Sequence, residues 1–112
     1  MRAQISIVLL LAAVVSITAC DQGEELSPED AVATNEVDVV DNRFEPAVIA
    51  VETGDTVTWT WGGETPHDVT GDDFASETQT DGTFTHTFET SGQYQYRCTI
   101  HSGMNGLVVV ED

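Results

Sequence analysis

Residues 94–110 read YQYRCTIHSGMNGLVVV, and the rest of the chain has to support this stretch. Its first part alternates aromatic with polar residues and its last part, residues 107–110, is an apolar run, as expected of two strands. Between them a thiol, an imidazole and a thioether fall within seven residues, at Cys98, His101 and Met104. A thiolate combined with imidazoles and a weak thioether is the ligand set that favours copper in trigonal electron-transfer sites.

Such a site needs a second imidazole, and His67 is the candidate, in a loop directly after Pro66. The third histidine, His86, shares strand parity with Phe84 and Phe88. We therefore expect His86 to pack at a strand surface or edge and not to bind metal.

From residue 36 onward the pattern predicts short strands separated by turn residues, with no helical period longer than one turn. The clearest strand is 56–61, because Val57, Trp59 and Trp61 share one face and threonines occupy the other. Strands at this spacing are typical of an antiparallel β-sandwich. We expect residues 44–47 to form a bend. The expected aromatic core comprises Phe44, Trp59, Trp61, Phe84, Phe88, Tyr94 and Tyr96.

The first 19 residues resemble an export signal. Arg2 supplies a positive charge, and the apolar run 5–15 is shorter than the roughly 20 residues that span a bilayer. Small residues precede Cys20, as in the lipobox of secreted lipoproteins, so we expect Cys20 to be lipidated; an ordinary cleavage site is the alternative. Residues 20–35 are acidic and predict a flexible tether, and residues 36–112 form the folded domain.

The chain has two cysteines. In an exported protein two cysteines suggest a disulfide, and a pairing of Cys20 with Cys98 is one interpretation. If Cys20 carries lipid, Cys98 is left as an unpaired thiol in an oxidising compartment, and metal ligation explains its presence.

The chain has 20 Asp and Glu against 3 Lys and Arg, and a formal net charge of −17. This charge argues against nucleic acid or an anionic lipid surface as a partner. An acid excess without any lysine resembles the proteins of salt-loving microbes. In near-molar salt the Debye length is about 3 Å, so docking would rest on short-range contact.

Several motifs together resemble the cupredoxins, in particular the plastocyanin, amicyanin and halocyanin group. The resemblance covers about residues 36–110 and its motifs occur in the family's order. They are Phe44-x-Pro46, Gly54-Asp55-Thr56-Val57-Thr58-Trp59, Pro66-His67-Asp68-Val69, Thr87-Phe88, Gly92-x-Tyr94-x-Tyr96-x-Cys98 and Cys98-x-x-His101-x-x-Met104. The spacing of the last motif matches amicyanin, whereas the Trp-x-Trp-Gly run and the acidic leader look more like halocyanin.

The resemblance implies a Greek-key sandwich that holds one type 1 copper ion. Its ligands would be His67, Cys98, His101 and Met104, with Met104 as the long axial ligand. The implied function is a membrane-anchored, monomeric electron carrier on the extracytoplasmic face, between redox proteins of a respiratory or photosynthetic chain. The exposed edge of His101 would be the electron port.

Two positions depart from the family pattern. Asp68 stands where Asn is common, and we expect it to accept a hydrogen bond from the Thr99 hydroxyl, tying two ligand loops together as outer-shell residues. An ionised Asp68 would favour Cu(II) and lower the midpoint potential relative to Asn. Trp61 stands where plastocyanin and amicyanin carry an Asn. It could shield the metal or pack in the core, and we favour the core because Trp61 shares its strand face with Val57 and Trp59.

Two other functions use the same residues differently. A copper storage or delivery module would share the fold but needs exchangeable copper, and such proteins favour exposed Met- or His-rich sites. An adhesion-type sandwich would bind no metal. Catalysis is disfavoured, because neither a triad, nor paired carboxylates, nor an open metal position can be assembled from the sequence.

Overall fold

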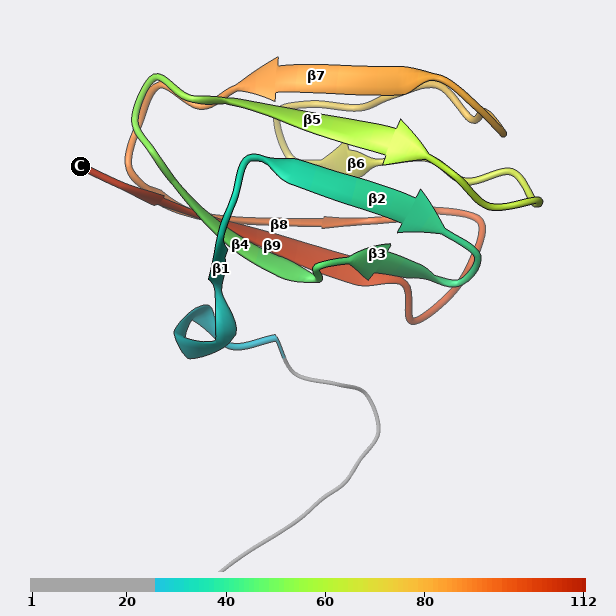
Figure 1. Ribbon diagram of the computed structural model, residues 1–112, viewed down its shortest axis with the longest axis horizontal. Helices are drawn as coiled ribbons and strands as arrows, with labels where there is room; N and C mark the ends of the chain where they lie inside the picture. The colour runs from blue at the N-terminus through green and yellow to red at the C-terminus, as the bar shows by residue number, and fades with distance from the viewer. Residues whose placement is uncertain (1–25) are drawn as a thin grey trace, which may run out of the picture.

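The computed structural model describes residues 26–112. In this range nine strands form two sheets, preceded by one turn of 3-10 helix, η1 (Pro28–Asp30) (Figure 1). The all-β sandwich predicted from the sequence is confirmed.

The five-stranded sheet contains, in spatial order, β1 (Val32–Ala33), β4 (Val48–Glu52), β9 (Asn105–Glu111), β8 (Gly92–Arg97) and β6 (Thr70–Gly71). The four-stranded sheet contains β3 (Arg43–Glu45), β2 (Glu36–Val40), β5 (Thr56–Trp61) and β7 (Thr83–Thr87). Both sheets are mixed and not purely antiparallel, because β1 and β9 run parallel to β4, and β5 runs parallel to β2. Alternation in a sequence reports which face of a strand is buried and not the direction of its neighbour.

The core lies between the sheets and is built around Trp59 of β5, which is fully buried. Its ring contacts Phe74 and Tyr96 and also Phe84, with centroids 5.4–5.8 Å apart. The alternation of β5 is as predicted, with Val57, Trp59 and Trp61 buried. Of the expected core aromatics, only Phe84 and Tyr94 are partly buried, packed against the edge of the core.

Two short strands lie where the sequence gave no strand pattern. Residues 32–33, inside the expected tether, pair with Ile49 and Ala50 as an edge strand, so the sheet begins earlier than residue 36. Residues 43–45 form β3, where we expected a bend, and pair with β2. Strands of two or three residues are too short to show a period of two.

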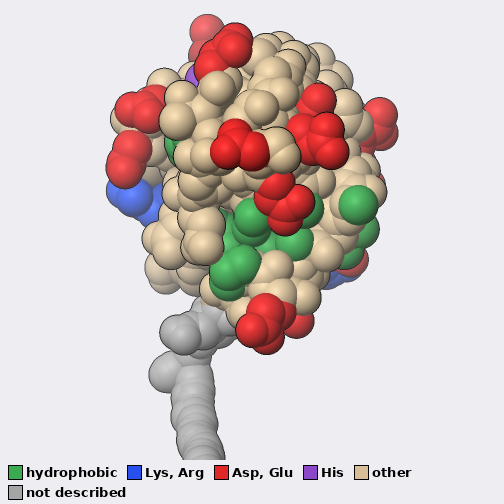
Figure 2. Space-filling model, turned by 90° about the vertical axis from the view of Figure 1, so that its left-hand side faces the viewer, with side chains coloured by type: hydrophobic (Ala, Val, Ile, Leu, Met, Phe, Trp, Pro, Cys, Tyr) green, Lys and Arg blue, Asp and Glu red, His purple; other side chains and the backbone are tan. Residues whose placement is uncertain are grey.

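The surface of the described domain is acidic. Figure 2 views the end opposite the metal-binding loops described below, where Asp and Glu side chains surround a small apolar area. Large exposed hydrophobic side chains in residues 26–112 are limited to Val32 and Ile100. The same range contains no helix with the length and hydropathy needed to cross a membrane.

The strands β2, β5 and β8 all end at the same end of the sandwich, at the right of Figure 1. Three connections therefore gather there: the β2–β3 turn, the β5–β6 loop and the β8–β9 loop. The loop that carries His67 crosses from the four-stranded to the five-stranded sheet, and the loop that carries Cys98 connects two strands of the five-stranded sheet.

Gly106 tests the packing of this sandwich. It pairs with Tyr96 across β8 and β9, and a Cβ at this position would overlap the buried Tyr96 ring. We expect Gly106→Ala to lower the free energy of unfolding by about 1–3 kcal/mol, measured by urea denaturation. Gly62→Ala is the control, because a Cβ there meets nothing within 4 Å. Equal stability of the two variants would contradict the described packing.

Candidate metal centre

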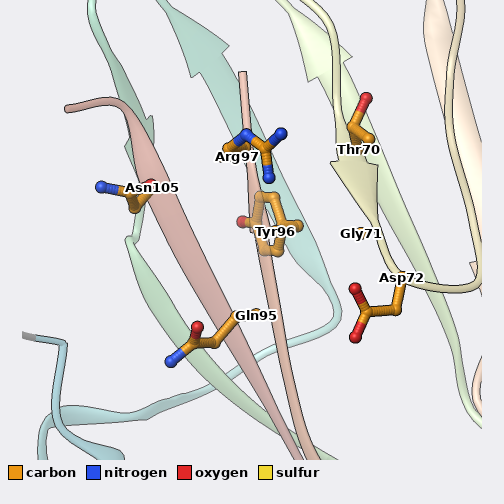
Figure 3. Close-up of a pocket in the computed structure, with 7 residues that line it drawn as sticks. All are labelled: Thr70, Gly71, Asp72, Gln95, Tyr96, Arg97 and Asn105. Carbon is orange, nitrogen blue, oxygen red and sulfur yellow. The ribbon is translucent and has the colours of Figure 1, made fainter. Parts of the chain in front are cut away.

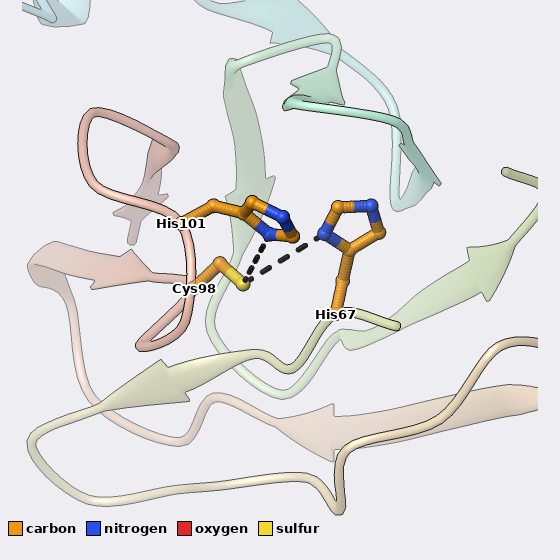
Figure 4. A group of neighbouring side chains, drawn as sticks. All are labelled: His67, Cys98 and His101. Carbon is orange, nitrogen blue, oxygen red and sulfur yellow. Dashed lines mark hydrogen bonds between the residues drawn. The ribbon is translucent and has the colours of Figure 1, made fainter. Parts of the chain in front are cut away.

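Three side chains converge between the β5–β6 and β8–β9 loops: His67, Cys98 and His101 (Figure 4). Their donor atoms all lie within 4.8 Å of one another. The Cys98 Sγ is 3.8 Å from the Nδ1 atom of each imidazole. The rings are tilted, with centroids 4.6 Å apart. The structure thus brings together the thiol and both histidines that the sequence singled out.

The spacing of these atoms fits a shared metal ion. Donors that bind one first-row ion at roughly 2.0–2.3 Å lie about 3.5–4 Å from each other, and the Cys98 sulfur lies at such a distance from each of the two Nδ1 atoms. His67 is fully buried and Cys98 is 3% exposed, whereas His101 is half-buried. A buried thiolate with two imidazoles suits copper. Cys98 is a free cysteine, and Cys20 lies outside the described residues.

Met104 is held beside this group by the shape of the β8–β9 loop. The Cys98 N–H donates to the Met104 carbonyl at 3.0 Å, and the Met104 N–H donates to the His101 carbonyl at 3.3 Å. Gly103 turns the chain with φ of +84°, a conformation that favours glycine. Met104 is 2% exposed and belongs to the core. Met104, the fourth candidate ligand, is therefore buried at the end of the β8–β9 loop, directly before β9.

Asp68 joins the two loops. Its Oδ1 accepts from the Thr99 N–H and its Oδ2 from the Thr99 hydroxyl, both at 2.7 Å, so the contact expected from the sequence is present. The Thr70 hydroxyl donates to Oδ2 at 3.1 Å. Burial alone would raise the pKa of Asp68, but the hydrogen bonds, chiefly those from Thr99, outweigh it and lower the pKa. Asp68 is thus held as a carboxylate next to His67.

A second carboxylate at the site was missed by sequence reasoning. Asp41, in the β2–β3 turn, lies behind His67 with Oδ1 3.3 Å from Nε2. The backbone N–H groups of Thr65 and Glu64, followed by the side chains of His67 and Thr65, lower the pKa of Asp41 to about 2. Asp41 is 26 positions from His67 and is one of 20 acids, so nothing in the sequence marks it.

The structure also shows where Trp61 and His86 lie relative to the core and the metal group. Trp61 belongs to the core, and its buried Nε1–H donates to the His67 carbonyl at 2.9 Å. His86 lies outside the metal group; its ring stacks on Phe74 and meets the edge of Phe88. Both positions agree with the packing expected from strand parity.

A separate polar pocket lies between β6, β8 and the start of β9 (Figure 3). Arg97, Asp72 and Asn105 line it, and neither histidine of the metal group nor Cys98 does. Arg97 precedes Cys98 in the chain but faces this pocket, so the two sites are distinct.

Comparison with known proteins identifies relatives of this arrangement. A family model described as a cupredoxin-like domain matches residues 7–110. Halocyanin from Natronomonas pharaonis is 41% identical over 78 residues, which cover 61% of this chain and 48% of halocyanin. Amicyanin from Paracoccus versutus is 35% identical over 92 residues, covering 75% of this chain and 67% of amicyanin. The chain spans about half the length of halocyanin and 58% of a plastocyanin from Tetradesmus obliquus.

Solved cupredoxin structures have a similar fold. A purple cupredoxin from Nitrosopumilus maritimus superimposes with a TM-score of 0.64 at 27% identity, covering 70% of this chain and all of that one. A reduced Cu(I) form of an amicyanin variant superimposes with a TM-score of 0.63 at 30% identity, covering 74% of this chain and 87% of that one.

The charge of Asp68 gives a prediction for the copper-loaded chain. Replacing Asp68 by Asn keeps the shape but removes a negative charge that favours the oxidised ion, so the midpoint potential should rise. Potentiometric titration measures this, with Asp72→Asn as the control because Asp72 is exposed and outside the metal group. A potential that stays the same or falls in Asp68→Asn would refute the electrostatic role of Asp68.

Proposed function

This chain belongs to the cupredoxin-like family, and on that premise we propose that it is a type 1 copper protein that carries single electrons between larger redox proteins. The observation that carries the proposal is the buried convergence of His67, Cys98 and His101, with Met104 in the same loop. The activity is a proposal for this chain because the match spans only 48% of halocyanin and 58% of the plastocyanin.

In the proposed site Cys98 would bind as a thiolate, His67 and His101 would bind through Nδ1, and Met104 would be the fourth ligand. Copper supplies a reversible one-electron change between Cu(II) and Cu(I). The chain's own residues hold the donors in place: Asp68 links the loops and the β8–β9 ladder fixes Cys98. A site whose ligands are held in place by the protein changes its geometry little between the two oxidation states. The free-energy barrier to electron transfer is therefore low.

A carrier fits this geometry better than an enzyme or a copper-delivery module. All four proposed positions are protein ligands, so no place is left for a substrate, in contrast to catalytic metal sites. Three of these residues, His67, Cys98 and Met104, are at most 3% exposed. Burial of the donors favours retention of the metal over its exchange.

His101 is the proposed electron port. It is the half-buried ligand, and the neighbouring Ile100 side chain is 50% exposed. Pro66 and Gly103 are also exposed. We propose that redox partners of a respiratory or photosynthetic chain dock on this small area by short-range contact. In residues 26–112 the exposed large hydrophobic side chains are Ile100 and Val32, and their small number supports a monomer.

We further propose that residues 1–19 are a lipoprotein signal peptide, that Cys20 is lipidated, and that the acidic residues between Cys20 and β1 tether the domain to the extracytoplasmic face of a membrane. Residues 1–25 lie outside the described part of the chain, so this rests on the sequence. Two or more acyl chains anchor a protein stably, whereas one does so only marginally.

The visible spectrum tests the copper site. One equivalent of Cu(II) should give the purified protein an intense visible band from thiolate-to-copper charge transfer, bleached by ascorbate, restored by an oxidant, and retained on dialysis against a chelator. Cys98→Ser should abolish the band, and His86→Ala should keep it, because His86 lies outside the metal group. A pale spectrum that ignores Cys98→Ser would rule out the type 1 assignment, and loss of copper to the chelator would favour delivery.

Membrane fractionation tests the anchor. In a host that processes lipoproteins we expect the wild-type chain in the membrane fraction and Cys20→Ser in the soluble fraction, with mass spectrometry showing acyl groups on the wild type alone. Equal distribution of the two chains would remove the lipid-anchor proposal and leave the copper site unaffected.

A further inference from the structure

The Asp41 carboxylate in the β2–β3 turn accepts several hydrogen bonds from the loop that carries His67. Its Oδ1 accepts from the Glu64 N–H at 2.9 Å, the Thr65 N–H at 3.1 Å and the Thr65 hydroxyl at 3.0 Å. The same oxygen lies 3.3 Å from His67 Nε2. One carboxylate oxygen therefore accepts three hydrogen bonds from a single loop and also lies beside the His67 ring nitrogen.

The backbone is shaped for this contact at Gly63. A Cβ there would collide with the Asp41 carboxylate and would lie 2.8 Å from the Asp41 backbone nitrogen. Only a residue without a side chain lets the loop approach the turn this closely. The backbone of the β5–β6 loop thus packs closely against Asp41, so the contact between Asp41 and His67 is part of the folded structure.

The two nitrogens of the His67 ring have different neighbours, and this contact concerns Nε2. Nδ1 faces the Cys98 sulfur, whereas Nε2 faces the Thr65 hydroxyl at 3.1 Å and Asp41 Oδ1 at 3.3 Å. A ring nitrogen that binds metal carries no proton, so in the neutral ring the proton must reside on the other nitrogen. The Thr65 hydroxyl donates its own hydrogen to Asp41 and keeps a lone pair that can accept from Nε2–H.

The other imidazole is held differently. His101 is half-buried, and within residues 26–112 the hydrogen-bond contact of its ring is that of Nδ1 with Cys98. The buried histidine therefore has a carboxylate behind it and the partly exposed one does not. Among the carboxylates of residues 26–112, Asp41 is the one that lies within hydrogen-bonding distance of a ring nitrogen of the metal group, and that ring is His67.

We propose that Asp41, directly and through the Thr65 hydroxyl, is a positioning residue that fixes His67 as the Nε2–H tautomer and makes its Nδ1 a stronger donor to Cu(II) than to Cu(I). A carboxylate behind a metal-bound imidazole orients the ring and raises its basicity. Asp41 therefore lowers the midpoint potential of the site. This inference rests on the proposed function, because it requires copper at His67.

The midpoint potential of the copper-loaded full chain is the first test. Loss of such a partner costs about tenfold or more in metal affinity. If that loss falls on Cu(II), Asp41→Asn raises the potential by about 59 mV for a tenfold change in a one-electron couple. Glu64→Gln is the matched control, because it removes a carboxylate from the same loop whose side chain makes no hydrogen bond in the described part of the chain. Equal potentials for Asp41→Asn and Glu64→Gln would overturn the proposal.

Thr65 provides a second pair of variants should Asp41→Asn fail to fold. Thr65→Val removes the hydroxyl that bridges Nε2 and Asp41, and Thr65→Ser restores it. We expect the potential to rise in Thr65→Val and to stay at the wild-type value in Thr65→Ser. The same potential in both variants would count against the bridge and overturn the proposal.

The tautomer of His67 is measured without copper, by nitrogen-15 NMR of the metal-free full chain. We expect the Nε2–H form in the wild type and in Glu64→Gln, and a mixture of tautomers in Asp41→Asn. An Nδ1–H ring in the wild type would overturn the proposal. A wild type that shows the Nε2–H ring but no charge-transfer band with Cu(II) would instead refute the proposed function, so the two failures are distinguishable.

Discussion

The contact between Asp68 and Thr99 is the constraint on which the metal centre depends. Asp68 follows His67 and Thr99 follows Cys98, so a pair of 2.7 Å hydrogen bonds sets the distance between two proposed ligands that are 31 residues apart in the chain. The ladders of β5 and β8 fix where the loops begin, but a direct bond is needed to fix where their side chains meet. Both hydrogen bonds are made by protein atoms alone, so the link between the two loops does not depend on a bound ion.

Much of this molecule could be predicted from the sequence, for a physical reason. Long strands with one buried face leave a period of two in the sequence, and Val57, Trp59 and Trp61 of β5 are where the pattern placed them. The proposed ligands could be identified because thiol, imidazole and thioether donors are rare in this chain, and three of them, Cys98, His101 and Met104, fall within seven residues. Asp68 could be predicted because it is adjacent to His67.

The features that could not be predicted depend on pairing across space. The parallel pairings of β4 with β1 and β9 leave no local trace, and the two residues of β1 are too few to show a period. Asp41 reaches His67 across 26 positions and looks like any turn acid in a chain with 20 of them. Gly63 was the available signal, but a glycine in a loop becomes informative only when the side chain opposite it is known.

Trp61 gives this protein an intrinsic optical reporter. Its indole N–H is bound to the His67 carbonyl, whereas Trp59, the other tryptophan of the chain, lies among the aromatic rings of the core. The two fluorophores therefore sample different surroundings: one follows the backbone of a ligand loop and the other follows the interior of the sandwich. Emission from a chain that retains only Trp61 would follow the ordering of that loop separately from global unfolding, without any attached label.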